Sequence, residues 1–368
     1  MKIIVNGLDL NSAVASVSKA LPQKEFSPIL EGIKIVARDD KIVLFASDTD
    51  LSIEKTISAR VEEEGEILVP GKILADYIRN IADSNDIILS CQDDNKLTIT
   101  YARSECYIQC LPFEEYPEKE NIDKSSYFVT TQRNLKDIVS KVIFSVATED
   151  TRPILKGIFI EAKEYTLSAV ATDGYRFAKC NKPLEERNDG LSAIIPARSL
   201  NELSKMLTED EDLVKVYIEK NYMTVDLPGT TLSARLFTEG QYISYENLIP
   251  KEFVTTIVAN KETVEKSLQT ASIMSRGDKN NLVSFDIEEY TMIITSSSEV
   301  GKIKESVSIS LKGKDMKCSY NQKYILDCLK GMDCDAIKME FTQHANCVIT
   351  MNGSDEALYF ILPVRTYA

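Results

Sequence analysis

The stretch PILEGIKIVARDDKIVLFASDTD, from Pro28 to Asp50, recurs later in the same chain. A shift of 125 residues without a gap places it on PILKGIFIEAKEYTLSAVATDGY, which runs from residue 153 to residue 175. A second shift of 125 residues reaches a more diverged copy, in which apolar and polar residues still alternate from Val283 to Ser298. Alternation with a period of two is typical of strands with one buried face. The chain is therefore predicted to contain a threefold internal repeat, with a pair of strands in each copy.

Helical patterns flank each strand pair. Upstream, Leu10, Val14 and Val17 follow the i, i+4, i+7 spacing of one helix face, and positions 135, 139 and 142 repeat it. The third copy shows the same pattern from Val264 to Ala271 after a slip of four residues. Downstream, a second helix begins near PGKILADYIRNI, PARSLNELSKML and YNQKYILDCLKGM, and strands such as IILSCQDDNKLTITYARSECYIQCLP follow. We expect three similar α+β domains, with boundaries near 124 and 250, at residues 1–124, 125–250 and 251–368.

The net charge is −14, which by itself disfavours nucleic-acid binding, because phosphate contacts depend on Lys and Arg. The second helix of each copy nevertheless carries the pattern [KR]-x-[LI]-x-[DE]-x-x-[KR]. Its two basic positions lie about 20° apart around the helix, opposite the apolar stripe. In a single helix, ion pairs between residues i and i+4 on a solvated face would explain this pattern. Its recurrence in all three copies instead indicates a positive surface that binds a phosphate backbone without reading bases. The basic positions are Lys72 and Arg79, Arg198 and Lys205, and Lys323 and Lys330, and the helix near residue 133 adds Arg133, Lys136 and Lys141.

Several classes of protein are disfavoured by the composition. The N-terminus MKIIVNGLDLNS lacks the apolar region of a signal peptide, and no stretch approaches the ~20 apolar residues that span a bilayer. The eight cysteines include no C-x-x-C pair, which predicts reduced, mostly buried thiols in a soluble cytoplasmic protein. His344 is the only histidine, which leaves little scope for a His-based zinc site or a nucleophile–His pair. We expect no metal and no cofactor.

The segment ATDGYRFAK, residues 171–179, has the residue types of an active-site loop, because an Asp-Gly pair is followed by an aromatic residue and an arginine. Asp173 aligns with Asp48 in the first copy but with Ser298 in the third. A position at which Ser replaces Asp between two strands is predicted to form a turn rather than a catalytic carboxylate. A metal or phosphoryl-transfer site at Asp48, Asp50 and Asp173 is the alternative, but no P-loop, ligand cluster or histidine accompanies these carboxylates.

Together these features resemble the bacterial DNA sliding clamp, the beta subunit of DNA polymerase III, over the whole chain. The most specific motifs are PILKG, ATDGYR, SRGDKNN at residues 275–281 and LPVRTY at residues 362–367. The resemblance implies a DNA clamp fold, in which three tandem domains each pack two helices on antiparallel sheets. Two such crescents would form a homodimeric ring around duplex DNA. The implied function is that of a processivity factor without enzymatic activity.

The resemblance also implies a pocket between the second and third domains that binds short peptides. Its partners would be the polymerase III alpha subunit, the clamp loader, and other polymerases and repair proteins. By position, the pocket would comprise Leu155, Thr172, Gly174, Tyr175, Arg176, Phe177, Ile243, Asn247, Leu248, Phe360, Leu362, Pro363, Val364 and Arg365.

Further positions follow from the same resemblance. The ring interface would use Cys106 and Ile108 from one domain, and Ile273 and Met274 from another. Lys24 and Arg152 would join the helix cations on the DNA-facing surface, which would bind double-stranded DNA without sequence specificity.

Two other functions remain open from the residues alone. A carboxylate-dependent phosphotransferase would show metal-dependent turnover, which a clamp would not. A scaffold that binds only proteins would not be retained on circular DNA.

Overall fold

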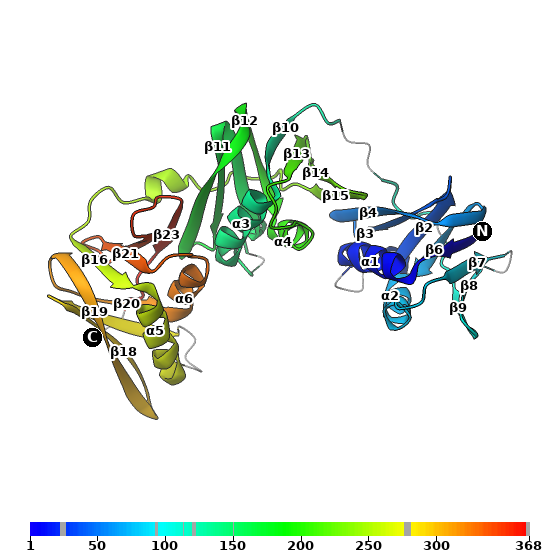
Figure 1. Ribbon diagram of the computed structural model, residues 1–368. Coiled ribbons are helices and arrows are strands. Elements are labelled where there is room, and N and C mark those ends of the chain that lie inside the picture. The colour runs from blue at the N-terminus through cyan, green and yellow to red at the C-terminus, as the bar shows by residue number, and fades with distance from the viewer. Residues whose placement is uncertain are drawn as a thin grey trace. The chain divides into compact units, whose positions relative to one another are not determined.

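The computed structural model describes residues 1–22, 27–92, 95–112, 114–119, 123–149, 151–275 and 281–365. The chain divides into two compact units, each built from two separate segments of the sequence. The first unit comprises Met1–Thr131 and Lys205–Leu236, and the second comprises Gln132–Ser204 and Phe237–Ala368. Figure 1 labels most of the helices and strands of both units.

The first unit contains a five-stranded sheet in the order β5-β1-β7-β8-β9 and an eight-stranded sheet in the order β10-β13-β14-β15-β4-β3-β2-β6. Helices α1 and α2 pack against each other, and α1 lies on β3 and β4. The elements are β1 (Lys2–Val5), α1 (Gly7–Val17), η1 (Ser18–Ala20), η2 (Pro28–Glu31), β2 (Gly32–Arg38), β3 (Lys41–Ser47), β4 (Leu51–Ser58), β5 (Arg60–Glu63), β6 (Gly65–Pro70), α2 (Gly71–Asn80), β7 (Ile87–Cys91), β8 (Lys96–Tyr101), β9 (Ser104–Gln109), β10 (Tyr127–Thr131), β13 (Leu213–Glu219), β14 (Tyr222–Leu227) and β15 (Thr230–Arg235).

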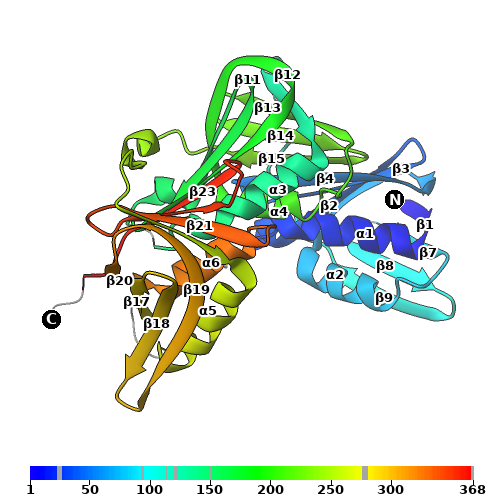
Figure 2. The same ribbon diagram turned by 60° about the vertical axis from the view of Figure 1, so that its left-hand side comes forward.

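The second unit contains a sheet in the order β11-β12-β23-β22-β21-β16-β19-β18-β17-β20. Figure 2 shows β23 beside the long strand β12, and α5 beside α6. The elements are α3 (Gln132–Val142), η3 (Ile143–Ser145), η4 (Pro153–Lys156), β11 (Gly157–Thr172), β12 (Arg176–Pro196), α4 (Ala197–Ser204), η5 (Tyr245–Leu248), β16 (Thr255–Asn260), α5 (Lys261–Ser275), β17 (Leu282–Glu288), β18 (Thr291–Ser298), β19 (Gly301–Gly313), β20 (Met316–Asn321), α6 (Gln322–Lys330), β21 (Ala336–Phe341), β22 (Cys347–Met351) and β23 (Ala357–Ile361).

The predicted internal repeat is confirmed. Helices α1 and α3 begin at Gly7 and Gln132, which are 125 residues apart, and α5 begins at Lys261, four residues later than the next interval. Strands β2, β11 and β17 begin at Gly32, Gly157 and Leu282, again at intervals of 125 residues. The second helices α2, α4 and α6 begin where the sequence predicts them.

The apolar faces of the first helices form the cores predicted from their spacing. Leu10, Val14 and Val17 of α1 are at most 1% exposed, and the corresponding residues of α3 and α5 are equally buried. Asn6 caps α1, because its side-chain Oδ1 accepts hydrogen bonds from the backbone N–H groups of Leu8 and Asp9. All eight cysteines are free thiols, and six of them are buried, as the sequence predicts.

Neighbouring repeats share sheets. In the first unit, β4 of the first repeat pairs with β15 of the second. In the second unit, β12 of the second repeat pairs with β23 of the third. The middle repeat therefore contributes strands to both compact units, because backbone hydrogen bonds join it to each neighbour. The predicted boundaries near residues 124 and 250 stay predictions.

Candidate functional site

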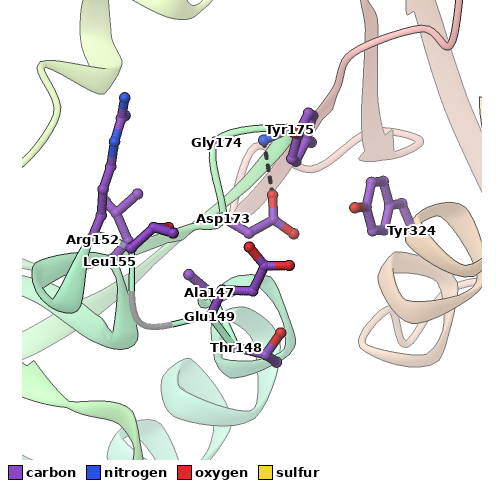
Figure 3. A pocket seen from close by; sticks show the side chains of 10 residues that line it. Ala147, Thr148, Glu149, Arg152, Leu155, Asp173, Gly174, Tyr175 and Tyr324 are labelled. Carbon is purple, nitrogen blue, oxygen red and sulfur yellow. Dashed lines mark hydrogen bonds between the residues drawn. The ribbon is translucent and has the colours of Figure 1, made fainter.

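A pocket of about 460 Å³ opens in the second unit beside the turn between β11 and β12. Arg152 and Leu155 lie at one end of it, and Tyr324 of α6 lies at the other (Figure 3). Of the residues expected to form a peptide pocket, Leu155, Gly174 and Tyr175 line this cavity. Its full lining is Ala147, Thr148, Glu149, Thr151, Arg152, Leu155, Asp173, Gly174, Tyr175 and Tyr324.

The turn beside the pocket is held by the side chain of Asp173. Its Oδ1 atom accepts hydrogen bonds from the backbone N–H groups of Tyr175 and Arg176, at 2.9 and 3.0 Å (Figure 3 shows the first). Gly174 has a φ of +90°, a conformation that glycine adopts without strain. In the first repeat, Asp48 accepts equivalent bonds from Asp50 and Leu51. The prediction that Asp173 forms a turn is confirmed.

Arg176 is buried beside this cavity and is not among the residues that line it, and its place in a peptide site stays a prediction. Its guanidinium is ion-paired with Asp173 at 3.1 Å and with Asp327 of α6 at 3.0 Å. It also donates to the carbonyl oxygen of Phe144 at 2.5 Å and lies 4.3 Å from the ring centroid of Tyr324. The side chain is 7% exposed and joins the turn to α6. Arg176 therefore positions the pocket wall.

Three other expected pocket residues are also buried in the protein core. The rings of Phe177 and Phe360 stack with centroids 5.0 Å apart, and both belong to one core cluster with Val348. The hydroxyl of Thr172 donates to the carbonyl oxygen of Arg176 and is 4% exposed as a residue. These three residues are therefore part of the core behind the cavity.

The remaining expected pocket residues lie outside the described lining of this cavity. Leu248 ends the short helix η5 and is 45% exposed, and Asn247 and Ile243 lie in and just before that helix. Leu362 is 36% exposed, and its backbone N–H donates to the carbonyl oxygen of Tyr175 at 3.0 Å. This bond places the C-terminal tail beside the turn. Pro363, Val364 and Arg365 line a second cavity beside the tail.

Several lining residues were not predicted from the sequence. Residues 147–151 form a polar segment just before the repeated PIL motif, and their positions carry no periodic signal. Tyr324 lies between Lys323 and Ile325, which the helix pattern did identify. The sequence feature that could have identified Tyr324 is an aromatic residue at the half-buried edge of an amphipathic helix.

The basic helix positions are exposed in most cases. Lys72 and Arg79 on α2 are exposed, as are Lys323 and Lys330 on α6. Arg133 at the start of α3 and Lys205 just after α4 are also exposed, whereas Lys136 and Arg198 are half-buried. Arg152 is exposed and lines the pocket, and Lys24 lies outside the described residues.

Lys141 is an exception, and its predicted place on the exposed face of α3 is wrong. Its side chain is 9% exposed and is ion-paired with Asp137 at 2.8 Å and with Glu356. Lys182 completes the cluster with contacts to the same two carboxylates, at 2.5 and 2.8 Å. Burial of Lys141 and its two acidic partners make it unavailable to a phosphate.

The expected interface residues lie at ends and edges of elements. Cys106 and Ile108 are on β9, the edge strand of the five-stranded sheet, where Ile108 is 6% exposed. Ile273 and Met274 are in the last turn of α5, and Ile273 is 51% exposed.

Among the described residues, no group of three or more His, Cys, Asp or Glu side chains could hold a metal ion.

Three tandem repeats, each with helices packed on antiparallel sheets, define the DNA clamp class of proteins. Family models of the DNA polymerase III beta subunit match the N-terminal domain at residues 1–122, the central domain at 130–242 and the C-terminal domain at 246–365. The chain belongs to the family of bacterial DNA polymerase III beta subunits, the sliding clamps.

Similar proteins cover nearly the full chain. The beta sliding clamp of Halalkalibacterium halodurans is 33% identical over 372 residues, which cover 96% of this chain and 97% of the relative. A crystal structure of the DNA polymerase sliding clamp from Bacillus subtilis has 28% identity and a TM-score of 0.95, with all of both chains covered. The DNA polymerase III beta subunit from Thermotoga maritima has 25% identity and a TM-score of 0.92, also over both whole chains.

Sliding clamps are processivity factors, accessory subunits rather than catalytic enzymes, and the phosphotransferase alternative has no support. The family implies DNA and a polymerase as partners, and clamps function as dimers. No described helix of the chain has both the length and the apolar character required to cross a membrane.

Proposed function

We propose that two copies of this chain close head-to-tail into a cytoplasmic ring around duplex DNA. In the ring, helix cations contact phosphates, and the pocket beside Tyr175 binds short peptides of the polymerase alpha subunit, the clamp loader and repair proteins. The observation that carries the ring is the way in which neighbouring repeats pair their strands.

Each internal junction joins equivalent strands. Strand β4 pairs with β15, and β12 pairs with β23. In the internal repeat, β4, the start of β12 and the first half of β19 occupy equivalent positions. Strands β9, β15 and β23 are equivalent to one another in the same way. Residues 301–308 of β19 pair with β18 on one side, and no described strand pairs with their other side. The third junction is therefore left for β9 of a second copy.

The pairing register of that junction follows from the register of the first. Leu51 pairs with Ala234 and Ile53 with Leu232. Positions on β4 correspond to positions 250 residues later on β19, and positions on β15 correspond to positions 126 residues earlier on β9. Gly301 would therefore lie opposite Ile108 of the partner subunit. The same shifts place Ile303 opposite Cys106 of the partner subunit. Two such junctions would use both free edges and form a closed, self-limiting dimer.

A disulfide tests both the register and the encirclement. Directly opposed residues in antiparallel strands have Cβ atoms about 4.5–5.5 Å apart, which is near the separation that a disulfide requires. Ile303→Cys should therefore form a disulfide with Cys106 of the partner subunit under mild oxidation. Oxidation of rings loaded on a nicked plasmid should leave clamp bound in high salt, and linearising the plasmid should release it.

Two controls separate the ring from chance oxidation. The double variant Ile303→Cys with Cys106→Ser should give no covalent dimer, and Lys304→Cys, whose side chain points to the opposite face of the sheet, should give little. A covalent dimer that remains on linear DNA in high salt would contradict encirclement. Failure of Ile303→Cys to cross-link, in a protein that sediments as a dimer, would contradict the register.

The peptide pocket is supported by its shape and lining. Its volume is typical of sites that bind small ligands or side chains. Its lining combines the apolar and aromatic side chains of Leu155, Tyr175 and Tyr324 with an equal share of polar and charged residues. Tyr175 is 65% exposed at its edge, and Leu362 lies beside the same turn. These exposed apolar side chains suit a peptide that inserts apolar anchors.

A further inference from the structure

The first unit contains a cavity of about 180 Å³ at the junction of β4 and β15, and the proposed function leaves it unused. Directly opposed residues form a row across β3, β4, β15 and β14. Ser47 pairs with Ser52, Ser52 pairs with Ser233, and Ser233 pairs with Thr224. The three serines line the cavity, and Ser47 and Ser233 are 5% and 8% exposed. The cavity therefore has a buried floor of hydroxyl groups.

In the second unit, the equivalent row carries three apolar side chains. It runs through Thr172, Phe177, Phe360 and Val348, because the same strand pairings recur there. The rings of Phe177 and Phe360 stack with centroids 5.0 Å apart. Serines occupy both of these positions in the first unit, so the space that the stacked pair fills in one unit is open in the other.

The turn beside the cavity has the same conformation as the turn at Gly174. Thr49, which lies 125 residues earlier, has a φ of +79°, and Gly174 has a φ of +90°. The N–H of Thr49 donates to Oγ of Ser47 at 3.2 Å, and the N–H of Gly174 donates to Oγ1 of Thr172 at 3.1 Å. The backbone frame is therefore shared, and the two places differ in the side chains that they present.

Charged residues form the rim of the cavity, where the second unit has exposed Tyr175 and Leu362. The N–H of Arg235 donates to the carbonyl oxygen of Asp50 at 2.8 Å, which matches the bond from Leu362 to Tyr175. Asp50, Arg235 and Glu118 all line the cavity and are exposed. Asp50 lies opposite Arg235 across the strand pair, so these two charges offset each other. The carboxylate of Glu118 leaves the rim with a net negative charge.

We propose that this cavity binds the guanidinium group of an arginine side chain from a partner protein. Sites for drug-sized ligands have volumes of roughly 300–1,000 Å³, so the smaller volume here suits a single side chain. A guanidinium carries a positive charge and five N–H donors, which complement the negative rim and the oxygen atoms of the floor. It also stacks on aromatic rings, and Tyr222 forms part of the wall.

The serine hydroxyls can accept from a guanidinium without losing their present hydrogen bonds. Oγ of Ser47 accepts from the N–H of Thr49, and a hydroxyl oxygen has a second lone pair. Ser233 and Thr224 share a hydrogen bond of 3.0 Å in which either hydroxyl can donate. When Ser233 donates this bond, both lone pairs of its oxygen remain available to a ligand.

This site is separate from the pocket beside Tyr175. All of its lining residues belong to the first unit, and its occupant is a charged side chain rather than an apolar anchor. A failure of the peptide pocket would therefore leave this proposal standing, and the reverse also holds.

A small arginine analogue tests the site without DNA or a partner protein. Saturation-transfer NMR on the full chain should show saturable binding of N-acetylargininamide. N-acetylcitrullinamide has nearly the same shape but no charge, and it should bind at least several-fold more weakly, because the rim is negative. Absence of saturable binding by the arginine probe, or equal binding of the two probes, would overturn the proposal.

Three variants locate the bound probe. Ser52→Phe combined with Ser233→Phe restores the stacked pair of the second unit and should abolish binding. Glu118→Gln leaves the cavity open and should weaken binding several-fold, and it serves if the double variant does not fold. Glu289→Gln removes an exposed carboxylate in the second unit and should bind the probe as the unmodified protein does. Unchanged affinity in the folded double variant or in Glu118→Gln would place the probe elsewhere and overturn the assignment of this cavity.

Discussion

Tyr175 and Arg176 are neighbours in the sequence, but the fold gives them different roles. Tyr175 is 65% exposed at the edge of the pocket, whereas Arg176 is 7% exposed beneath it. The guanidinium of Arg176 is the shared partner of Asp173 and Asp327, so its removal would leave two nearly buried carboxylates without that partner. Exposure thus separates a residue that can contact a ligand from one that holds the wall.

This difference predicts opposite phenotypes. Arg176→Ala should lower the free energy of unfolding by about 3–5 kcal/mol, as is typical when a buried pair loses one partner. Tyr175→Ala should change stability little but weaken a peptide with a Gln and paired apolar anchors by about 30-fold, the equivalent of ~2 kcal/mol. Urea denaturation and fluorescence anisotropy measure the two effects. Equal stability losses in both variants would contradict the assignment.

At the scale of a single element, helix α3 contains a lysine, Lys141, that was predicted to lie on the helix surface but is buried in an ion-pair cluster. Lys141 and Lys182 share Asp137 and Glu356, so the cluster joins α3, β12 and the turn before β23. Burial opposes ionisation of the carboxyl groups, but hydrogen bonds from the two lysines outweigh it and lower the pKa of both Asp137 and Glu356. The cluster therefore stabilises the second unit while its acids are ionised.

The lowered pKa values set the pH range of this contribution. Glu356 has an ordinary pKa of 4.5, and an acid whose pKa falls on folding stabilises the protein above that value. Glu356→Gln should reduce the free energy of unfolding at pH 7 by on the order of 1 kcal/mol, since the side chain is one-third exposed. The difference from the unmodified protein should shrink as the pH falls below about 4.5.

Urea denaturation between pH 7 and pH 3 measures this difference. Glu164→Gln is the matched control, because Glu164 forms an exposed pair with Arg187 and should contribute little. A deficit of Glu356→Gln that stays constant down to pH 3 would show that the ionised cluster is not its cause.

At the scale of the whole molecule, the distribution of charge matters more than its total. The chain has 57 acidic and 43 basic residues, yet exposed cations recur at matched positions on α2 and α6. Contacts between cations and phosphates release counterions, so they depend steeply on salt and not on base sequence.

Two triple variants with the same net charge separate these effects. Lys72→Glu, Arg198→Glu and Lys323→Glu should together reduce retention on circular DNA equally for different sequences, and should lower the salt slope by about one for each phosphate that is no longer neutralised. Lys41→Glu, Lys163→Glu and Lys312→Glu change the charge equally on exposed strand positions and should retain DNA nearly as well. Equal reductions in both variants would implicate net charge rather than the helix faces.

The sequence alone determined the threefold repeat and the kind of each element. Local spacing was sufficient there, because periods of two and of 3.6 residues reflect which side of a strand or helix is buried. The turn at Asp173 was equally predictable, since its hydrogen bonds join residues that are neighbours in the chain. The repeat also identified basic positions such as Lys72 and Lys323, because three copies separate a shared feature from chance.

Only the tertiary structure decided which of these side chains are available to a partner. Lys141 was expected on a helix surface and Arg176 in a pocket wall, but both are buried and paired with carboxylates more than 150 residues away in the sequence. Tyr324 faces the pocket because α6 packs beside a turn from a different repeat. Burial and ion pairing are sums over distant neighbours, and local spacing carries no information about them.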